Sequence, residues 1–409
     1  MKKSLLFILV LTAASSLKGQ TWMQQNSNST NDFNTIFATN DNRAHAFGDS
    51  TDIFGGFALG SHYLSTNQGF SWGYIPLNSI VYTSNESYFV NDNVGYLVGK
   101  NQLSGNGFIL KTSNGGTSWT EGVPHVERLE AVHFENANVG YAAGRNDYVV
   151  RTVDGGANWV DVSSNTGDHI LGVSFTNPEN GYIVGRAGNI AHTVDSASTW
   201  VNQNSNTNED LEAVWFVNDS TGWAVGTAGA IVFTSDSGTT WVNQTSGTPE
   251  DLLDVEFVND TTGWAVGLAG TVLITTDAGA TWSAQNSNTN EDIFSITMRN
   301  NQLGWFCGTN GAIYLYAVTA PNSITEVNSN IETSVYPNPF DNTTTLTIKG
   351  SNNNLPVTVN ILDMNGRIVR SYWTISNGAI IEKGNLNSGI YLLQISNESA
   401  ISTQKLIIK

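Results

Sequence analysis

Short hydrophobic runs alternate with turns rich in Gly, Asn and Asp over most of the chain. One stretch shows the pattern, with hydrophobic segments at residues 211–217, 223–225 and 230–234 and another from Trp241 onward. Runs of this length, bounded by turn residues, are typical of β-strands. Four strands in roughly 40 residues, repeated along the chain, predict an all-β fold built from β-propeller blades.

Two motifs mark each repeat. The first is a strand motif such as "TGWAVG" at residues 221–226, and the second is a box such as "TVDGGANW" at residues 152–159. The boxes close on tryptophans that recur, in the later repeats, every 40 or 41 residues: Trp72, Trp119, Trp159, Trp200, Trp241 and Trp282. A fixed period of this length indicates stacked copies of one structural unit.

The last repeat lacks a box, and the start of the chain supplies the missing part. Residues 21–27 ("TWMQQNS") match the segment that follows a box, for example residues 200–205 ("WVNQNS"). We therefore expect the N-terminal strand to complete the last blade and close the ring, because closure removes exposed sheet edges. With Trp22 counted, the tryptophans predict a seven-bladed propeller over residues 20–318.

The box residues are expected to form turns and not a reactive site. Ser, Thr, Asp and Asn side chains accept backbone N–H bonds in tight turns, glycine permits positive φ, and Trp fills the space between sheets. The acidic or amide position of the box holds Asn67, Asn114, Asp154, Asp195, Asp236 and Asp277. Asn at two of these positions suits a turn better than proton transfer.

The repeats resemble bacterial neuraminidase repeats (Asp-boxes), and within that group the photosystem II stability/assembly factor-like propellers. The resemblance rests on the "GWAVG" motif followed by the box, and it covers residues 20–318. It implies that the boxes lie on the face away from the ligand funnel and are not catalytic. A role in photosystem assembly is not carried over, because those propellers bring a basic patch whereas this domain is strongly acidic.

Composition and the first residues indicate a secreted protein. Residues 1–19 begin with Lys2 and Lys3 and continue with a short hydrophobic run and then small residues, with Lys18 near the end, which is the layout of a signal peptide. Its removal leaves 14 basic against 35 acidic residues, a charge that repels nucleic acid. We expect no transmembrane segment, because the hydrophobic run is too short to span a bilayer. We also expect the protein to be a monomer. Cys307, the single cysteine, is expected in the core.

The loops opposite the boxes carry the candidate ligand-binding residues. Acidic pairs recur in "NEDL", "PEDL" and "NEDI", and basic residues occupy some loops between the second and third strands of a repeat. The set is Glu209, Asp210, Glu250, Asp251, Glu291, Asp292, Arg145 and Arg186. An acidic arc at the mouth of the channel would attract a cation or a basic peptide. The alternative is a set of solvated loops whose acids cap turns.

Two functions remain open. The first is a secreted or surface-attached binding propeller without catalytic residues, whose ligand is a glycan, a peptide or a protein. The alternative is a secreted glycoside hydrolase, sialidase-like or other, that uses carboxylates at the channel mouth. The sequence lacks the Phe-Arg-Ile-Pro segment of sialidases and any metal-binding histidine spacing. No cofactor is expected, with calcium left open at the acidic loops.

A second module follows a linker at residues 319–333. Alternating hydrophobic residues at 357–364, 368–375, 390–396 and 404–408 predict a small β-sandwich over residues 334–409, with a hairpin turn at Asn365-Gly366. The module resembles the type A C-terminal sorting domain of the Bacteroidetes type IX secretion system. The matching residues include Tyr336, Pro337, Asn338, Pro339, Asp363, Gly366, Gly389, Tyr391, Lys405 and Lys409. The resemblance implies contact with the secretion machinery and export through the periplasm, with removal of this module afterwards.

Deletion of residues 334–409 should leave the protein in the periplasm, because the signal peptide directs passage across the inner membrane alone. Cell fractionation followed by blotting with an antibody against residues 20–318 measures this, with the full-length chain as control. Export of the truncated chain at the normal level contradicts the sorting assignment.

Overall fold

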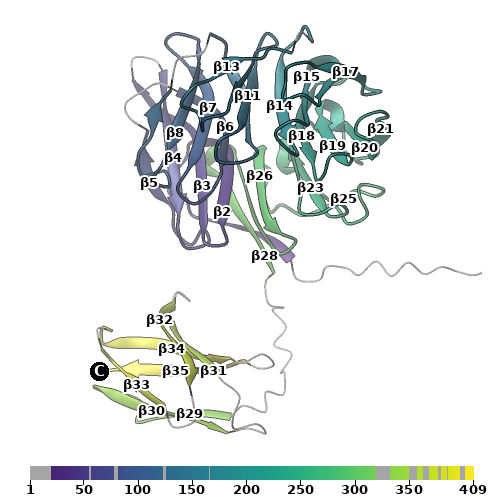
Figure 1. Cartoon of the computed structure of the whole chain (residues 1–409). Helices are drawn as coiled ribbons and strands as arrows, with labels where there is room; N and C mark the ends of the chain where they lie inside the picture. Colours follow the sequence, from purple (N-terminus) through teal and green to yellow (C-terminus); the bar gives the residue numbers. More distant parts are fainter. Residues whose placement is uncertain are drawn as a thin grey trace, which may run out of the picture. The chain divides into compact units, whose positions relative to one another are not determined.

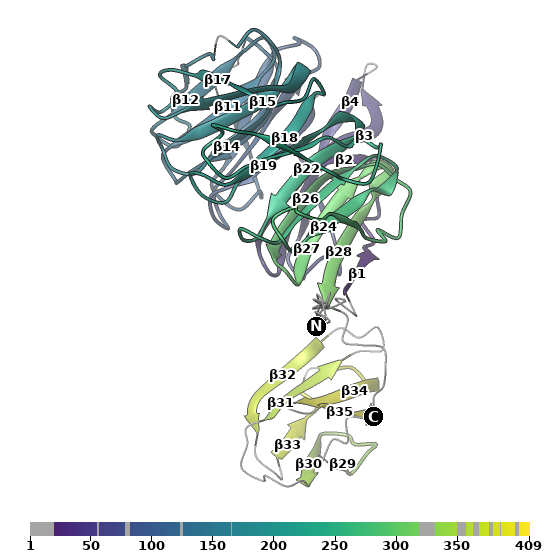
Figure 2. The ribbon, with the colours of Figure 1, turned by 90° about the vertical axis from the view of Figure 1, so that its right-hand side faces the viewer.

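The computed structural model consists almost entirely of antiparallel β-sheets (Figure 1). It describes residues 20–54, 57–77, 82–122, 126–164, 166–318, 332–349, 357–362, 368–375, 379–384, 386–396 and 401–409. The chain divides into two compact units, Met1–Ala320 and Pro321–Lys409, and each is considered by itself. The described residues of the first unit form four-stranded sheets that resemble propeller blades and lie around a common centre (Figures 1 and 2).

The sheets are numbered here in chain order. Sheet 1 contains β2 (Asp32–Asn40), β3 (Arg43–Phe54), β4 (Phe57–Ser65) and β5 (Gly73–Pro76). Sheet 2 contains β6 (Tyr82–Phe89), β7 (Gly95–Asn101), β8 (Gly107–Thr112) and β9 (Thr120–Glu121). Sheet 3 contains β10 (Leu129–Phe134), β11 (Gly140–Gly144), β12 (Val149–Thr152) and β13 (Val160–Asp161). Sheet 4 contains β14 (Ile170–Phe175), β15 (Gly181–Gly185), β16 (Asn189–Thr193) and β17 (Val201–Asn204).

The remaining sheets of the first unit follow the same order. Sheet 5 contains β18 (Leu211–Phe216), β19 (Gly222–Gly226), β20 (Ile231–Thr234) and β21 (Val242–Gln244). Sheet 6 contains β22 (Leu252–Phe257), β23 (Gly263–Gly267), β24 (Val272–Thr275) and β25 (Ser283–Ala284). Sheet 7 contains β26 (Ile293–Asn300), β27 (Leu303–Gly308), β28 (Ile313–Val318) and β1 (Gln20–Gln24). In sheets 4 to 7 a short 3₁₀ turn joins the second and third strands: η1 (Arg186–Gly188), η2 (Thr227–Gly229), η3 (Leu268–Gly270) and η4 (Thr309–Gly311).

The hydrophobic core lies between neighbouring sheets. Every residue of β11, β15, β19 and β23 is buried, because these second strands are covered on both faces. The outermost strands are short and exposed, as in β13 and β25. The predicted strands of the repeat at residues 211–241 therefore appear with bounds that differ by one or two residues, because buried packing and not propensity sets their ends.

Aromatic stacking joins sheets 2 to 6 in succession and explains the Gly-Trp or Gly-Tyr pair of the strand motif. Trp223 of β19 stacks on Phe257 of sheet 6 with ring centroids 3.6 Å apart, and the box residue Trp282 meets the same ring edge-on at 5.9 Å. Gly222 must lack a side chain, because a Cβ atom there would lie 2.6 Å from the Phe216 ring. Equivalent stacks recur in Tyr96–Phe134, Tyr141–Phe175 and Tyr182–Phe216.

The N-terminal strand pairs with the last strand of the first unit. Strand β1 runs antiparallel to β28, in a register that places Gln20 opposite Val318. Trp22 is 1% exposed and packs against Phe306 and Tyr316, with ring centroids 4.5 Å and 4.8 Å away. Strand β1 therefore takes the place of the fourth strand that the other sheets receive from the segment after a box.

One glutamine contact shows that Trp22 is equivalent to the box tryptophans. The Trp22 Nε1–H donates to Gln285 Oε1 at 3.3 Å. The same bond joins Trp241 to Gln203 and Trp282 to Gln244, each at 3.0 Å. In each case the glutamine lies on the outer edge of the preceding sheet, so its amide fastens one sheet to the tryptophan of the next.

The second unit contains two sheets with their own core. One sheet contains β29 (Glu332–Tyr336), β30 (Thr343–Lys349) and β33 (Ala379–Glu382). The other contains β31 (Val357–Leu362), β32 (Ile368–Ile375), β34 (Gly389–Ser396) and β35 (Ile401–Ile408). Side chains of both sheets, including Leu346 and Ile361, form a buried cluster.

The sorting-motif residues are distributed over this second unit. Asn338 donates through Nδ2 to the Lys405 carbonyl at 2.6 Å and accepts from the Ile407 N–H at 2.8 Å, which ties the start of the module to its last strand. Tyr336 is 82% exposed. Gly389 begins β34 and Tyr391 follows in it. Asp363 and Gly366 lie outside the described residues.

Replacing Trp22 by alanine should lower the free energy of unfolding of the first unit by about 3–5 kcal/mol, because a fully buried aromatic side chain is lost. Urea denaturation followed by tryptophan fluorescence measures the change. Val242→Ala, at an exposed position of β21, is the control and should change it by less than about 0.5 kcal/mol. Equal effects of the two substitutions would contradict a stabilising role of β1 as the fourth strand of sheet 7.

Candidate functional site

Each box closes its own turn through side-chain hydrogen bonds. In the box at residues 152–159, the Thr152 hydroxyl donates to Asp154 Oδ1 at 2.9 Å and accepts from the Gly156 N–H. The Asn158 N–H also donates to Asp154 Oδ1, and its side-chain amide donates to Asp154 Oδ2. These bonds, led by the one from the Asn158 side chain, lower the pKa of Asp154 to about 2. Both oxygens of the carboxylate are occupied within the turn.

The other boxes repeat this geometry. Asp195, Asp236 and Asp277 each accept the N–H of the residue four positions ahead, at 2.8–2.9 Å. Asn67 and Asn114 accept the same bond through their amide oxygens. The closing tryptophans lie against the sheet interfaces, with Trp72, Trp119, Trp241 and Trp282 buried and Trp159 and Trp200 partly buried. All these turns join the third strand of a sheet to its fourth.

At the opposite ends of the sheets, three of the candidate acids bind the preceding sheet. Asp210, Asp251 and Asp292 each accept a backbone N–H through Oδ1, at 2.8–2.9 Å. The donors are the middle residues of the 3₁₀ turns, Ala187, Ala228 and Ala269, whose φ is positive. One oxygen of each aspartate is thereby used between sheets, which is the turn-capping alternative raised by the sequence.

The glutamates beside them differ from one another. Glu209 Oε2 accepts from the Thr227 hydroxyl at 2.9 Å. Glu291 Oε2 accepts from the Thr309 hydroxyl and the Asn310 amide. The position equivalent to Thr227 is Leu268 in sheet 6, so Glu250 lacks that hydroxyl partner. The three glutamates remain at the rim, two of them held by their own sheet.

Arg145 forms an ion pair that the sequence did not predict. Its Nε lies 3.3 Å from Glu130 Oε1, and Arg128 Nε lies 2.9 Å from the same oxygen. The Glu130 side chain is 13% exposed and also accepts from the Asn85 amide at 2.8 Å. Arg186 lies in η1. The mouth therefore carries arginines over sheets 3 and 4, where Glu127, Glu130 and Asp168 also lie, and acids over sheets 5 to 7.

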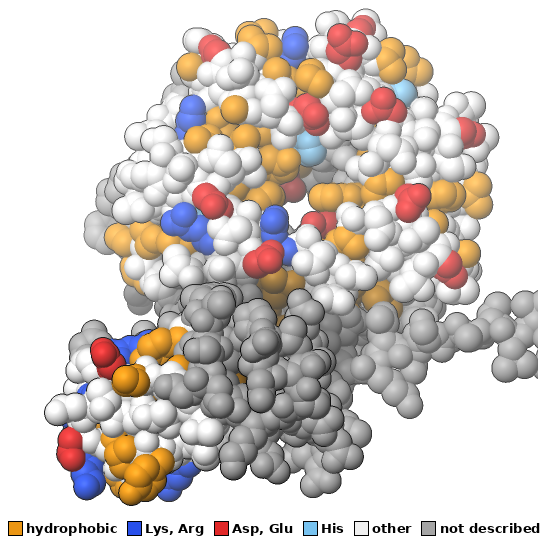
Figure 3. Space-filling view, turned by 60° about the horizontal axis from the view of Figure 1, so that its bottom comes forward, with side chains coloured by type: hydrophobic (Ala, Val, Ile, Leu, Met, Phe, Trp, Pro, Cys, Tyr) orange, Lys and Arg blue, Asp and Glu red, His pale blue; other side chains and the backbone are white. Residues whose placement is uncertain are grey.

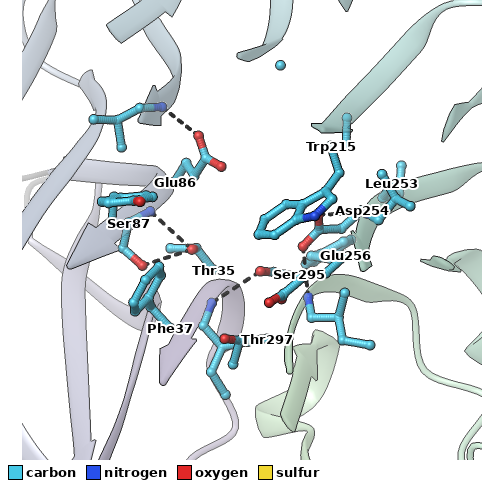
Figure 4. Close-up of a pocket in the computed structure, with 18 of the residues that line it drawn as sticks. Thr35, Phe37, Glu86, Ser87, Trp215, Leu253, Asp254, Glu256, Ser295 and Thr297 are labelled. Carbon is cyan, nitrogen blue, oxygen red and sulfur yellow. Dashed lines mark hydrogen bonds between the residues drawn. The ribbon is translucent and has the colours of Figure 1, made fainter. Parts of the chain in front are cut away.

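A central cavity of about 240 Å³ lies between the first strands of the sheets. Side chains from β2, β6, β10, β14, β18, β22 and β26 line it. Figure 3 shows the first unit from the end that carries the boxes, hollowed at its centre, with acidic and basic side chains around the hollow. Figure 4 shows Glu86 on one wall and Asp254 and Glu256 on the facing wall, with Trp215 beside them.

Polar side chains in this cavity bind the backbone of the neighbouring first strand. A first strand has no ladder partner on its inner edge, and buried N–H groups need an acceptor. Glu86 Oε2 accepts the Val132 N–H at 2.5 Å, and Asp254 Oδ2 accepts the Ile296 N–H at 2.8 Å. Glu256 Oε2 accepts the Met298 N–H at 3.0 Å.

Between other sheets, hydroxyl groups accept the backbone N–H groups of the neighbouring first strand. Ser295 Oγ accepts the Ile36 N–H and Thr297 Oγ1 accepts the Ala38 N–H, both at 3.3 Å, from sheet 7 to sheet 1. Ser174 Oγ accepts the Phe216 N–H at 3.2 Å. The acceptors fall at two fixed positions of the first strand, so these bonds form two layers around the cavity.

Burial changes the ionisation of the cavity acids. It raises the pKa of Glu86 to about 8 and that of Asp254 to about 6, and it raises the pKa of Glu256 well above its usual value. The N–H bond that each carboxylate accepts opposes the rise in its pKa, and the charge of Asp254 raises the pKa of both glutamates further. No group of three His, Cys, Asp or Glu side chains in the described part of the chain is placed to hold a metal ion.

Sequence reasoning missed these cavity acids, although a signal was present. Acids interrupt otherwise hydrophobic runs in "LEAVHF", "LEAVWF" and "LLDVEF", which supply Glu130, Glu212, Asp254 and Glu256. In a strand covered on one face by a core, alternate positions point to the other face. Acids at those positions in first strands indicate a polar channel. Cys307 is buried, as expected, with its thiol 3.3 Å from the Phe33 carbonyl oxygen.

Comparisons with known families agree with both resemblances. Residues 157–248 and 244–330 match the family model described as photosynthesis system II assembly factor YCF48. Residues 334–409 match the secretion system C-terminal sorting domain. This sorting domain indicates export by the type IX system to the cell surface or the extracellular space, and contact with that machinery. No curated protein matches the chain. No helix within the described ranges has the length and hydrophobicity needed to cross a membrane.

Solved structures support the propeller-like fold. A structure titled "YCF48 bound to D1 peptide" is 17% identical, with a TM-score of 0.61, and the match covers 74% of this chain and 97% of that one. YCF48 from Cyanidioschyzon merolae is 17% identical, with a TM-score of 0.58 and coverage of 74% and 100%. The WD40 propeller domain of Doa1 is 10% identical, with a TM-score of 0.61 and coverage of 75% and 99%. Identities this low establish the fold and not the ligand.

Replacing Glu86 by glutamine should flatten the pH dependence of stability. The folded-state pKa of about 8 exceeds the usual 4.5, so the free energy of unfolding falls as the pH rises from 4.5 to 8. The loss is at most about 1.4 kcal/mol for each pH unit. Glutamine keeps an acceptor for the Val132 N–H and removes this titration. Urea denaturation at several pH values measures the slope.

The matched control for this test is Glu179→Gln, at an exposed carboxylate on the box side of sheet 4. The change in the free energy of unfolding between pH 5 and pH 8 should be the same in this variant as in the wild type, within about 0.5 kcal/mol. An unchanged slope in Glu86→Gln would show that the cavity does not desolvate this carboxylate.

Proposed function

We propose that this protein is a secreted or surface-attached binding propeller that takes a peptide segment of a partner protein at its channel mouth, without catalysis. The propeller spans residues 20–318, with residues 319–333 as linker and 334–409 as sorting module. It has seven blades closed by the N-terminal strand, and it acts as a monomer. The observation that carries the proposal is the cavity between the first strands, whose charged side chains face a common opening.

Contacts between the ends of the series of sheets support closure. Strand β26 of sheet 7 contacts β2 of sheet 1 in the same way as successive first strands contact one another. The layered hydrogen bonds continue across this junction, from Ser295 and Thr297 to the backbone of β2. Asn310 of η4 donates its N–H to Asp32 Oδ1 at 2.9 Å, repeating the bond that Asp210 makes in sheet 5.

The rim residues are proposed as the first contacts for the ligand. Glu209, Glu250 and Glu291 retain carboxylate oxygens at the rim, whereas the neighbouring aspartates spend one oxygen between sheets. Among the candidate residues of the mouth, the arginines lie over sheets 3 and 4 and the free glutamate oxygens over sheets 5 to 7, and this asymmetry favours a ligand with a fixed orientation. The similar structure titled "YCF48 bound to D1 peptide" supports a peptide as the ligand class.

A glycoside hydrolase is the second candidate, and one observation favours testing it. Glu86 has a pKa of about 8 and would be protonated at neutral pH, as a general acid requires. A hydrolase also needs a second carboxylate free to act as base or nucleophile. Of the carboxylates facing Glu86, Asp254 uses both oxygens to accept the N–H groups of Val255 and Ile296. Burial raises the pKa of Glu256 well above its usual value, which disfavours the ionised form that a base or nucleophile needs. We therefore favour binding.

Probing a peptide array with the fluorescently labelled full-length protein tests the proposal. Peptides with basic residues should bind, and Glu209→Gln combined with Glu291→Gln should weaken binding about tenfold, because two rim charges are lost. Glu179→Gln, on the box side, should bind like the wild type. Equal binding by all variants, or cleavage of a glycan panel that Glu86→Gln abolishes, would contradict a binding-only function at this mouth.

A further inference from the structure

The central cavity combines features that the mouth loops do not share. It has a volume of about 240 Å³, and its described lining contains two basic side chains, Arg299 and His133. Burial lowers the pKa of His133 to about 4, so this imidazole is neutral near neutral pH. Arg299 is already engaged, because its guanidinium lies 3.6 Å from Asp41 Oδ1 and donates to the Ala38 carbonyl. The cavity acids therefore face an enclosed space without a matching positive charge.

Two of these acids keep an oxygen for a further partner. Glu86 and Glu256 each use Oε2 to accept a backbone N–H, and no second hydrogen bond from described residues reaches either carboxylate. They come from β6 and β22, on facing walls of the cavity (Figure 4). A ligand between them would meet one carboxylate oxygen on each side.

Aromatic rings supply a second and independent feature. Phe37, Tyr88 and Trp215 line the cavity, one layer nearer the box end of the first strands than Glu86. The ring centroids of Phe37 and Tyr88 are 5.2 Å apart, on the wall of sheets 1 and 2. Trp215 lies on the wall formed by sheet 5, and Figure 4 shows its ring turned toward the cavity. The faces of such rings attract ammonium groups.

The wall also has a recess of small residues. Ala131, Gly172 and Ala213 occupy, in sheets 3 to 5, the position that Glu86 and Asp254 hold in sheets 2 and 6. The walls at this level are therefore apolar on one side and acidic on the other. A ligand that fits has a short aliphatic chain and a compact positive charge.

From these features we propose that the cavity binds an alkylammonium group, that is, a primary amine on an aliphatic chain. The group is the side chain of a lysine presented by a partner or the end of a free diamine. A metal ion is a poor fit, since no three ligands converge among the described residues. The inference rests on the proposed binding function and adds the chemical group that the ligand brings.

Binding should be coupled to proton release. Burial raises the pKa of Glu86 to about 8 and that of Glu256 well above its usual value, and a nearby ammonium group favours the ionised form of each carboxylate. Each proton released makes the affinity rise up to tenfold for each pH unit, in the range below the pKa of the free site. Affinity should therefore increase between pH 6 and pH 8.

Isothermal titration of the full-length protein with cadaverine and with Nα-acetyl-lysine amide tests the proposal. Both should bind, and 1-pentanol, which has the chain without the charge, should not. Cadaverine binding without binding of the lysine derivative would assign the site to free diamines, and the reverse to lysine side chains. Titrations at pH 6 and pH 8, in buffers of different ionisation enthalpy, measure proton release.

Glu86→Gln and Glu256→Gln should each weaken amine binding at least tenfold, while Glu179→Gln should leave it unchanged. Asp254→Asn is a further variant in case one glutamine variant is unstable, and thermal melting checks that each is folded. Amine binding that is absent, independent of pH or unaffected in folded variants overturns the proposal. If peptides still bind the rim in that case, the binding function stands and the alkylammonium site alone fails.

Discussion

The unpaired inner edge of each first strand is the constraint on which the architecture depends. The first strands converge around the centre, where neighbouring strands splay apart and cannot form a regular ladder. Their N–H groups are satisfied by side chains of the preceding sheet, among them Glu86, Asp254, Glu256, Ser295 and Thr297. A buried N–H without an acceptor costs about 1–3 kcal/mol, so several such bonds together decide whether the sheets meet.

The same bonds give the channel its chemistry. An apolar channel would leave these N–H groups without acceptors, whereas a channel of carboxylates brings charge into a confined space. Burial then raises the pKa of the acids, so the structure holds proton-binding groups at its centre. Hydroxyl groups serve the same structural purpose between sheets 7 and 1 without that electrostatic cost. The distribution of acids and hydroxyls around the centre therefore sets where charge is concentrated.

The repeat and its β-structure could be predicted from the sequence because both depend on local patterns. Hydrophobic runs, glycine-containing motifs and box turns act within a few residues, and the match of Trp22 to the box tryptophans indicated how the chain ends meet. The candidate site was harder to predict. The sequence left open whether Asp210 and Asp251 meet a ligand or cap turns, and it could not identify their partners, which are backbone N–H groups 23 residues earlier in the chain.

The cavity could not be predicted from the sequence for the same reason, because it is formed by residues that lie far apart in the chain. The alternation within "LLDVEF" shows that Asp254 and Glu256 share a face of β22, but not that Glu86, far earlier in the chain, lies on the opposite wall. Sequence spacing gave the face of each strand, whereas the volume between the strands depends on how seven sheets pack. The sequence therefore identifies single residues of the first strands as candidates. Only the three-dimensional structure shows that they form one site.

The register of β1 and β28 determines at which end of the sheets the chain continues after the first unit. Val318, the last residue of β28, lies opposite Gln20 at the end of the sheets where the boxes are found. Whatever follows Val318 leaves from that end. A protein tethered to a cell through the segment after residue 318 is therefore held by its box side. The channel mouth lies at the other end of the strands, away from the point at which such a tether is attached.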